Sequence, residues 1–343
     1  EIVAEARWAD LQRSLGESPD LLLRSDAGRL SLRGWTDRFV ADLNTGVRLG
    51  DWPKAQARAT AHGTFEGDTR QLEIQSFQLD GFGGQVTGTG RIALQDPVVG
   101  SLQLQGRGLD PRFLDPRFAG RVDVRSAIDF DSVGNFRVQV PAASGTLFKR
   151  PLRASGTVTR NPQGLAFDDV RVLAGVNSVE FAGQLGDQVG GKQSQRLAGN
   201  FRIDAPDLVT LWPAFQGQLR GTGKLGGTTA QPSLDLDLAG SGLVAGDLRI
   251  HSLQARGGGD ARQRLVADVE AAGLSWSGKP LGNLSLRVAG RRDAQTVEVA
   301  LAGGDVEAQL GATGTYKNGI VTETIGRVMV TVQLSSWVAQ RKA

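Results

Sequence analysis

The feature that most constrains this chain is an alternation of apolar and polar residues that runs, with interruptions, from Leu30 to Tyr316. Successive side chains of a β-strand point to opposite faces, so this alternation predicts a sheet with one apolar face and one polar face. In the run SLDLDLAG, for example, Leu234 and Leu236 alternate with Asp235 and Asp237. A helix would place its apolar residues three and four positions apart. The sequence therefore predicts an all-β protein.

The alternation also assigns side chains to the apolar face. Trp276 belongs to this set because it keeps phase with Leu274. We predict that the set lines one continuous apolar surface, with Asp235, Asp237 and Glu298 on the polar side. Its members are Leu102, Leu104, Val122, Val124, Val179, Phe181, Leu234, Leu236, Leu238, Leu248, Ile250, Trp276, Leu284, Leu286, Val297, Val299 and Leu301.

Composition excludes several functions. The 343 residues include 47 glycines and only 6% aromatic residues, which indicates many turns and a thin core. The absence of cysteine excludes disulfides, thiolate metal sites and cysteine nucleophiles. A net charge of +3, from 39 basic and 36 acidic residues, gives no support to a nucleic-acid partner. No apolar run approaches the roughly 18 residues that span a bilayer, and the first residue is Glu, so we expect a segment of a longer chain.

An internal repeat relates residues 72–92 to residues 165–185, at an offset of 93 positions. In both copies the apolar phase slips by one residue, between Ile74 and Phe77 and again between Phe167 and Val170. A slip of this kind is typical of a β-bulge or of a bend at a corner. No exact short-period repeat is present, which argues against a leucine-rich solenoid and a strict β-helix.

Two segments predict very short helices, and the N-terminus predicts a strand followed by a bend. Asp110 precedes Pro111, which suits an N-cap followed by the first helical residue, and Pro116 ends that segment. The second segment begins near Pro206 and ends at Pro213. The first sixteen residues fit both helical and alternating spacing, and the strand is preferred.

The residues of three segments carry a family resemblance. These are GQLRGTGKLGGTTAQPSLDLDLAGSGLVAGDLRIHSLQARGGG (217–259), LRASGTVTRNPQGLAFDDVRVLAGVNSVEFAGQLGD (152–187) and DLVTLWPAFQG (207–217). They resemble the TamB family, which belongs with the AsmA-like bridge proteins of the diderm bacterial envelope. The resemblance extends from the segment around Trp8 to about Tyr316, and residues 320–343 match poorly. We expect residues 1–343 to form one continuous segment without an internal boundary.

The resemblance implies a β-taco, a long antiparallel sheet folded lengthwise into an elongated trough with an apolar interior. The residues support the same architecture, because an apolar face made mainly of Leu, Val, Ile and Ala leaves space that a closed sandwich would fill with larger side chains. A lipid tail could occupy that space, since each methylene removed from water contributes about 0.8 kcal/mol without any polar contact.

Function and partners follow from the resemblance as expectations. It implies conduction of phospholipids between the inner and outer membranes, assistance to outer-membrane protein assembly such as that of autotransporters, or both. It also implies phospholipid acyl chains as ligands, a BamA-like outer-membrane partner of the TamA type, and no cofactor. The segment would lie in the periplasm, anchored to the inner membrane through a part of the parent chain that is not present here.

Catalytic chemistry finds little support in the sequence. Only His62 and His251 could act as imidazole bases, and neither predicts a triad. Acidic residues occur singly on alternating positions, as on the polar face of a sheet, rather than as a glycosidase pair. The glycine-rich run 81–90 lacks the Lys-Ser/Thr ending of a phosphate loop. We therefore expect no enzymatic activity.

Two function classes remain open at this stage. The first is a lipid-conducting or strand-guiding envelope segment, and the second is an extracellular β-solenoid or adhesin-like module with a filled core. The six tryptophans, Trp8, Trp35, Trp52, Trp212, Trp276 and Trp337, could stack on sugars, but they are scattered along the chain. Packing within the protein is the preferred interpretation of these residues.

Overall fold

The computed structural model describes residues 1–14, 22–35, 37–50, 54–66, 69–188, 195–229, 231–260, 264–291, 294–304, 306–317 and 320–332. These residues form twenty-one β-strands and two single-turn 3-10 helices, which confirms the all-β fold class. The chain divides into two compact units, Glu1–Gly175 (unit 1) and Val176–Ala343 (unit 2).

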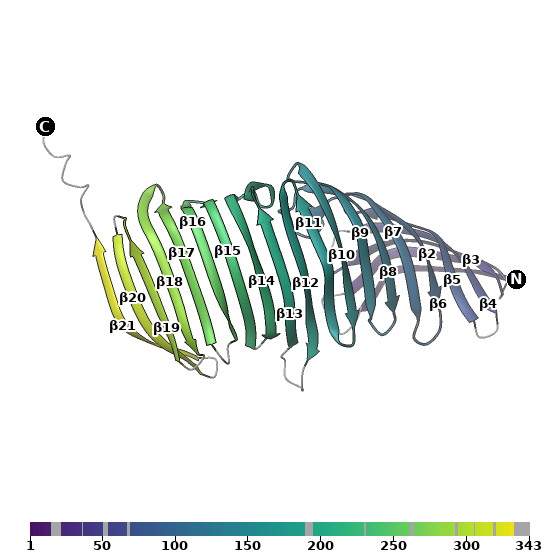
Figure 1. Cartoon of the computed structure of the whole chain (residues 1–343). Coiled ribbons are helices and arrows are strands. Elements are labelled where there is room, and N and C mark those ends of the chain that lie inside the picture. Colours follow the sequence, from purple (N-terminus) through teal and green to yellow (C-terminus); the bar gives the residue numbers. More distant parts are fainter. Residues whose placement is uncertain are drawn as a thin grey trace. The chain divides into compact units, whose positions relative to one another are not determined.

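Unit 1 is an antiparallel meander, in which each strand pairs with the next one along the chain (Figure 1). Its sheet is curved rather than flat, and β2 and β3 pass behind β7 to β9 in the view of Figure 1, as expected of a trough wall. The strands are β1 (Ile2–Ser14), β2 (Leu22–Gly34), β3 (Phe39–Leu49), β4 (Ala55–Glu66), β5 (Thr69–Gly81), β6 (Gly84–Ala93), β7 (Val99–Leu109), β8 (Gly120–Asp131), β9 (Phe136–Leu147), β10 (Arg150–Asn161) and β11 (Gly164–Ala174).

Unit 2 repeats the same topology, again with antiparallel pairing between successive strands. Its last strand lies in the segment 320–343, whose strand assignment is the least secure from the sequence, and residues 333–343 lie outside the described residues. The strands are β12 (Asn177–Gln188), β13 (Gln195–Ala205), β14 (Phe215–Thr228), β15 (Gln231–Ala245), β16 (Leu248–Asp260), β17 (Arg264–Trp276), β18 (Lys279–Arg291), β19 (Ala294–Ala302), β20 (Val306–Lys317) and β21 (Ile320–Val332).

The predicted phase slips are β-bulges. On β5, Ile74 pairs with Ala61 and Phe77 pairs with Ala59, and the register shifts between them. Because Ala59 and Ala61 share one face of β4, the extra residue on β5 returns both apolar pairs of that strand to the same face. The second copy behaves alike: the register of β10 and β11 shifts, and Asp169 in β11 adopts a positive φ of 49°. The bulge prediction is confirmed.

Both predicted short helices are present as single 3-10 turns. The first covers Pro111–Phe113, and the carboxylate of Asp110 accepts a hydrogen bond from the backbone N–H of Arg112. The second covers Leu208–Thr210. A buried asparagine holds it, because the side chain of Asn177 donates to the carbonyl of Asp207 and accepts from the Asp207 N–H. The first segment of the chain is the strand β1, as preferred from its sequence.

In neither unit do the described residues form a second layer over the sheet. Among the described residues, strands make extensive contact only with their neighbours in the meander, and the 3-10 turns add small contacts with β8 and β14. Buried apolar side chains are accordingly few and mostly alanine, with Phe39 and Leu274 as the larger members. The chain exposes 22512 Å², whereas a compact globular protein of 36.3 kDa would expose about 13,000 Å². The described residues therefore do not form the filled core that the adhesin-like alternative requires.

Within the described residues, no helix has the length and apolarity that a membrane-spanning helix needs.

Candidate functional site: an apolar lane on each sheet

The register of unit 2 joins apolar residues of successive strands into one row. Each member lies opposite the next across a strand pair, so the row runs perpendicular to the strands. We call this row lane 2. One of its members is a glycine, and the others carry apolar side chains. Lane 2 comprises Val179, Ile203, Gly221, Leu238, Ala255, Val269, Leu286, Val299 and Leu310.

Unit 1 contains an equivalent row, lane 1, which crosses all eleven of its strands. Its register passes through the bulges without changing face, because each extra residue restores the alternation. Lane 1 comprises Ala4, Leu32, Ala41, Ala61, Ile74, Gly90, Leu102, Ile128, Val138, Val158 and Phe167.

The structure brings the sequence-predicted lining residues onto these faces within each unit. Leu104, Val122 and Val124 flank lane 1 on β7 and β8, and Phe181, Leu236 and Val297 form the row beside lane 2. On the other side of lane 2, Leu284 pairs with Leu301, and Trp276 pairs with Leu248. Leu243 lies against Gly240 of the same face and pairs with Ile250.

Most of the predicted lining residues are half-buried. Leu234, at 41%, and Trp276, at 55%, are the more exposed members of the set. Intervening residues such as Asp235, Asp237 and Glu298 are exposed, as the alternation predicts. Half-burial without a covering layer means that the lanes are surfaces, not the interior of a core. Lipid contact of these residues stays a prediction.

Large side chains on the apolar faces lie over glycines of the neighbouring strand. A Cβ added at Gly223 would overlap the ring of Phe201, and one added at Gly90 would meet Leu102. The same relation joins Gly100 with Phe130. Because glycine has no side chain, the neighbouring residue can lie along the sheet instead of standing upright. This explains part of the glycine content and gives the lanes a shallow, closely packed floor.

The polar face of unit 2 is a ladder of alternating charge. The row between lane 2 and its neighbour consists of Glu180, Arg202, Thr222, Asp237, Arg256, Asp268, Arg287 and Glu298. Within it, Arg256 lies 3.5 Å from Asp237, and Arg287 lies 3.8 Å from Asp268. Exposed pairs of this kind contribute little stability each. They do favour the observed register, since a slip of two residues would separate Asp237 from Arg256 and Asp268 from Arg287.

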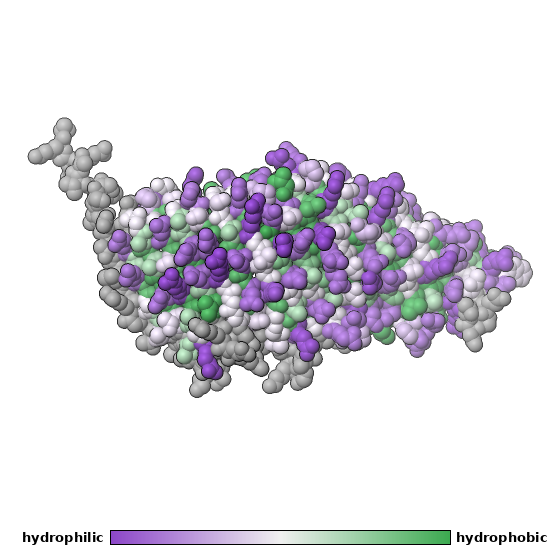
Figure 2. Space-filling model, viewed as in Figure 1, coloured by the Kyte–Doolittle hydropathy of each residue, from purple (hydrophilic) through white to green (hydrophobic). Residues whose placement is uncertain are grey.

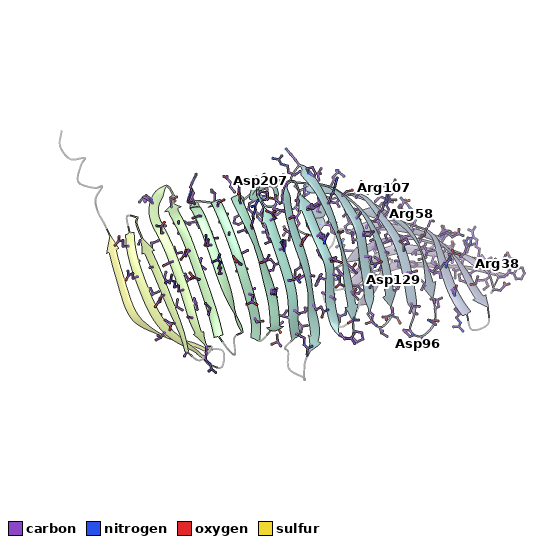
Figure 3. The ribbon with its side chains drawn as sticks, viewed as in Figure 1. Arg38, Arg58, Asp96, Arg107, Asp129 and Asp207 are labelled. Atoms are coloured by element: carbon purple, nitrogen blue, oxygen red, sulfur yellow. The ribbon has the colours of Figure 1, made fainter. Side chains whose placement is uncertain are left out.

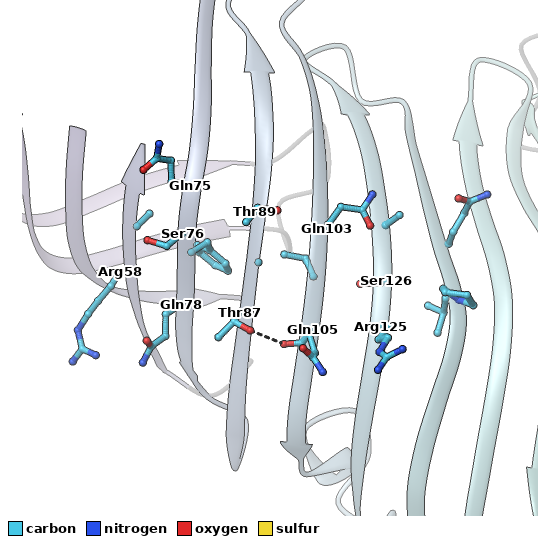
Figure 4. A pocket seen from close by; sticks show the side chains of 18 of the residues that line it. Arg58, Gln75, Ser76, Gln78, Thr87, Thr89, Gln103, Gln105, Arg125 and Ser126 are labelled. Carbon is cyan, nitrogen blue, oxygen red and sulfur yellow. Dashed lines mark hydrogen bonds between the residues drawn. The ribbon is translucent and has the colours of Figure 1, made fainter. Parts of the chain in front are cut away.

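The polar face of unit 1 is hollowed. A groove of about 1140 Å³ crosses β3 to β11, close to the bulges of β5, β9 and β11 (Figure 4). At its rim, hydrogen bonds from Gln85 and Gln78, together with the charge of Arg58, lower the pKa of Asp80. Gln103, Gln105 and further amide and hydroxyl side chains line the groove. Reasoning from alternation missed this feature, because alternation does not report how a sheet curves.

Titratable groups do not assemble into a reactive centre on the described residues. His62 on β4 contacts Gln75 through Nδ1 at 2.9 Å, and His251 on β16 is exposed. Arg58 and Asp129 project from strands, whereas Arg38, Asp96 and Asp207 lie near strand ends (Figure 3). No group of three or more metal-ligating residues occurs among the residues described. Hydrophilic residues spread over the visible face of both units, with hydrophobic residues exposed between them (Figure 2).

The tryptophans make separate packing contacts. The indole N–H of Trp8 donates to Ser25 at 2.6 Å, and Trp212 packs edge-on against Phe215. Trp35 is 63% exposed, and Trp276 ends β17. Trp52 and Trp337 lie outside the described residues.

Comparisons with known proteins agree with the resemblance noted from the sequence. Residues 2–343 match the family described as "TamB, N-terminal domain". The chain is 24% identical over 224 residues to a protein of Haemophilus influenzae named "Translocation and assembly module subunit TamB". That alignment covers 62% of this chain and 16% of the relative, so the chain spans a small part of the curated relative's length. No solved structure matches the chain.

Proposed function

Because the chain belongs to the TamB family, whose N-terminal domain it matches over residues 2–343, we propose that its apolar lanes carry phospholipid acyl chains between the membranes of the envelope. The supporting observation is the unbroken apolar register of lanes 1 and 2, which no second layer covers in the described residues. A protein that needed only a stable sheet would cover such a face, because exposed apolar area of this extent otherwise promotes association.

The dimensions of the lanes suit this cargo. Eleven strands at a spacing of about 4.8 Å give lane 1 a length of roughly 50 Å. An acyl tail spans about 15 Å, half of the hydrocarbon core of a bilayer. A tail lying across three or four strands would therefore find the same apolar surface at every position. Each methylene removed from water gains about 0.8 kcal/mol, so no position needs a specific polar contact.

Movement along the lane follows from this uniformity. Leu238, Val269, Leu286 and Val299 present aliphatic groups of similar size, and no charge interrupts them. A tail can then exchange one set of contacts for an equivalent set without leaving the apolar surface. The phosphate-bearing head group remains in water beside the lane, and no residue needs to act as an acid, a base or a metal ligand.

We further propose that the segment lies in the periplasm and works with an outer-membrane partner of the TamA type. The support is the name of the curated relative, a subunit of a translocation and assembly module. Anchoring to the inner membrane would come from another part of the parent protein. The same proposal includes assistance to outer-membrane protein assembly, as a consequence of supplying lipid to the outer membrane.

Photo-crosslinking in cells tests the proposal. A benzophenone amino acid at Val299 or at Leu286 should form adducts with phospholipid, because both positions lie in lane 2. The matched control is Glu298, which lies between two lane-facing residues of β19 but points to the polar side. Adducts at all three positions in equal yield, or at none of them, would contradict the proposal.

A blocking variant provides an independent test. Leu286→Arg places a charge in lane 2, and an unpaired charge beside an acyl chain is strongly unfavourable. Envelope permeability to detergent should rise although the protein accumulates normally. The control Arg287→Gln changes the adjacent residue on the polar face and should leave permeability unchanged. Normal permeability in cells carrying Leu286→Arg at wild-type protein level would rule out lane 2 as a conduit.

A further inference from the structure

The groove on the polar face of unit 1 has a distinctive chemistry. Of the 26 residues that line it, thirteen carry an uncharged amide or hydroxyl group, and four are charged, namely Asp42, Arg58, Arg125 and Asp169. The two positive and two negative charges balance. Nine successive strands, β3 to β11, contribute to the lining, so the groove extends across the strands as a long, open channel.

The comparison with unit 2 shows that this chemistry is not a general property of the polar face. The row Thr89, Gln103, Ala127, Gln139 and Thr157 crosses β6 to β10 of unit 1. The corresponding charge ladder of unit 2 alternates acidic and basic residues. Either row, the amides and hydroxyls of unit 1 or the charges of unit 2, would keep its face soluble. Solubility therefore does not explain why uncharged amides occupy the hollowed part of the sheet.

Several groove side chains have their hydrogen-bonding groups available. Gln103, Thr89 and Ser155 form no side-chain hydrogen bond with other described residues, and Thr87 makes only a long one of 3.5 Å to the carbonyl of Gln105 (Figure 4). Each amide offers two donors and an acceptor, and each hydroxyl offers one donor and an acceptor. The groove therefore presents an array of neutral donors and acceptors that repeats with the strand spacing of about 4.8 Å.

From this arrangement we propose that the polar groove of unit 1 binds an extended, uncharged glycan of the β-1,4-linked type. The rise per sugar of such a glycan is close to the strand spacing, so successive sugars meet equivalent side chains on successive strands. Neutral hydroxyl and acetamido groups are matched by amides and hydroxyls. Because the charges of the groove cancel, it offers no cationic surface for a polyphosphate. From β3 to β10 each strand is paired on both sides, so this part of the groove offers no unpaired strand edge of the kind that an extended polypeptide would use.

The groups that carry this proposal are separate from those that carry the lipid function, because the groove amides alternate with lane residues along each strand. On β7, Gln103 and Gln105 alternate with Leu102 and Leu104 of the apolar face, although Leu104 also borders the groove. A protein that carried lipid along one face and held a glycan on the other would be positioned on a polysaccharide while it worked. The lipid crosslinking tests and the glycan test can therefore fail separately.

Titration of the 343-residue chain with chitohexaose, followed by isothermal calorimetry, tests the proposal. We expect saturable binding, and about a tenfold loss of affinity in Q103A/Q139A, as two hydrogen bonds of ordinary strength would give. Thr89→Val, which keeps the side-chain volume and removes the hydroxyl, should weaken binding by a smaller factor. The control R256A/D268A removes two members of the unit 2 charge ladder and should bind as the wild type does.

Cellohexaose, which lacks the acetamido groups, shows whether hydroxyls alone are sufficient. Binding of either sugar that depends on Gln103 supports the site. Absence of saturation with both sugars overturns the proposal, and so does binding that neither Q103A/Q139A nor Thr89→Val weakens. Circular dichroism of each variant establishes that a loss of binding does not arise from unfolding.

Discussion

Gly63 lies under the ring of Phe39, and this pair allows a quantitative test of how large side chains lie over glycines. A Cβ at position 63 would overlap the ring, and Phe39 is only 8% exposed. Gly63→Ala must therefore displace the ring from the sheet. Loss of a buried Phe side chain costs about 1.5 to 3 kcal/mol. Replacing glycine by alanine also lowers the conformational entropy of the unfolded chain, which stabilises the folded protein by about 0.4 to 1 kcal/mol. The net destabilisation should be about 1.5 kcal/mol.

Hydrogen exchange of the β3 and β4 amides is the suitable assay, because local opening of one strand pair would be diluted in a global unfolding curve. Gly311→Ala is the matched control, since an added Cβ there meets nothing within 4 Å and should be neutral or slightly stabilising. In Phe39→Leu the smaller side chain should relieve much of the cost of Gly63→Ala. The overlap argument would be refuted if the β3 and β4 amides exchanged no faster in Gly63→Ala than in the wild type, as is expected of the β20 amides in Gly311→Ala.

Three further predictions concern packing, charge and the helical turn. Leu286→Ala should cost well under the roughly 2 to 5 kcal/mol of a filled core, because no second layer of described residues covers Leu286; denaturant unfolding measures this, and a cost within that range would restore the filled-core interpretation. Hydrogen bonding by Arg117 lowers the pKa of Asp115 from 3.8 to about 2. Because the folded-state pKa is depressed, the stabilisation from this pair is complete above about pH 4 and is lost as pH falls through the folded pKa; an NMR titration should move toward 3.8 in Arg117→Ala. Asn177→Ala removes the acceptor of the Asp207 N–H, whereas the Asp207 carbonyl still accepts from Thr210. The variant should cost about 1 to 2 kcal/mol, seen as faster amide exchange of the 3-10 turn at residues 208–210.

Much of this fold could be predicted from the sequence because its information is local. Alternation in SLDLDLAG determines which side chains of β15 share a face, and the slip between Ile74 and Phe77 marks the bulge. The 3-10 turn at Pro111–Phe113 follows from Asp110 and Pro111. Meander topology then places sequence neighbours side by side, so long-range pairing adds few choices.

The remainder depended on geometry that alternation does not encode. The overlap of Phe201 with Gly223 requires the register of β13 against β14, which only the paired strands define. The polar groove depends on sheet curvature, and a solvated face looks the same in sequence whether it is flat or hollow. One signal was present: the runs QVTGTG and LQLQG contain amides and hydroxyls where other strands carry charges.

The meander also has a consequence for how such a protein changes in length. Within each unit a strand depends on its predecessor and its successor, so inserting one hairpin alters two interfaces and leaves the others as they were. Such an insertion would lengthen the sheet by about 10 Å. Gene duplication could therefore lengthen the sheet of a unit by whole hairpins without requiring a new hydrophobic core. The 93-residue offset between residues 72–92 and 165–185 relates β5 and β6 to β11 and β12, which is the trace expected of duplication of a block of six strands.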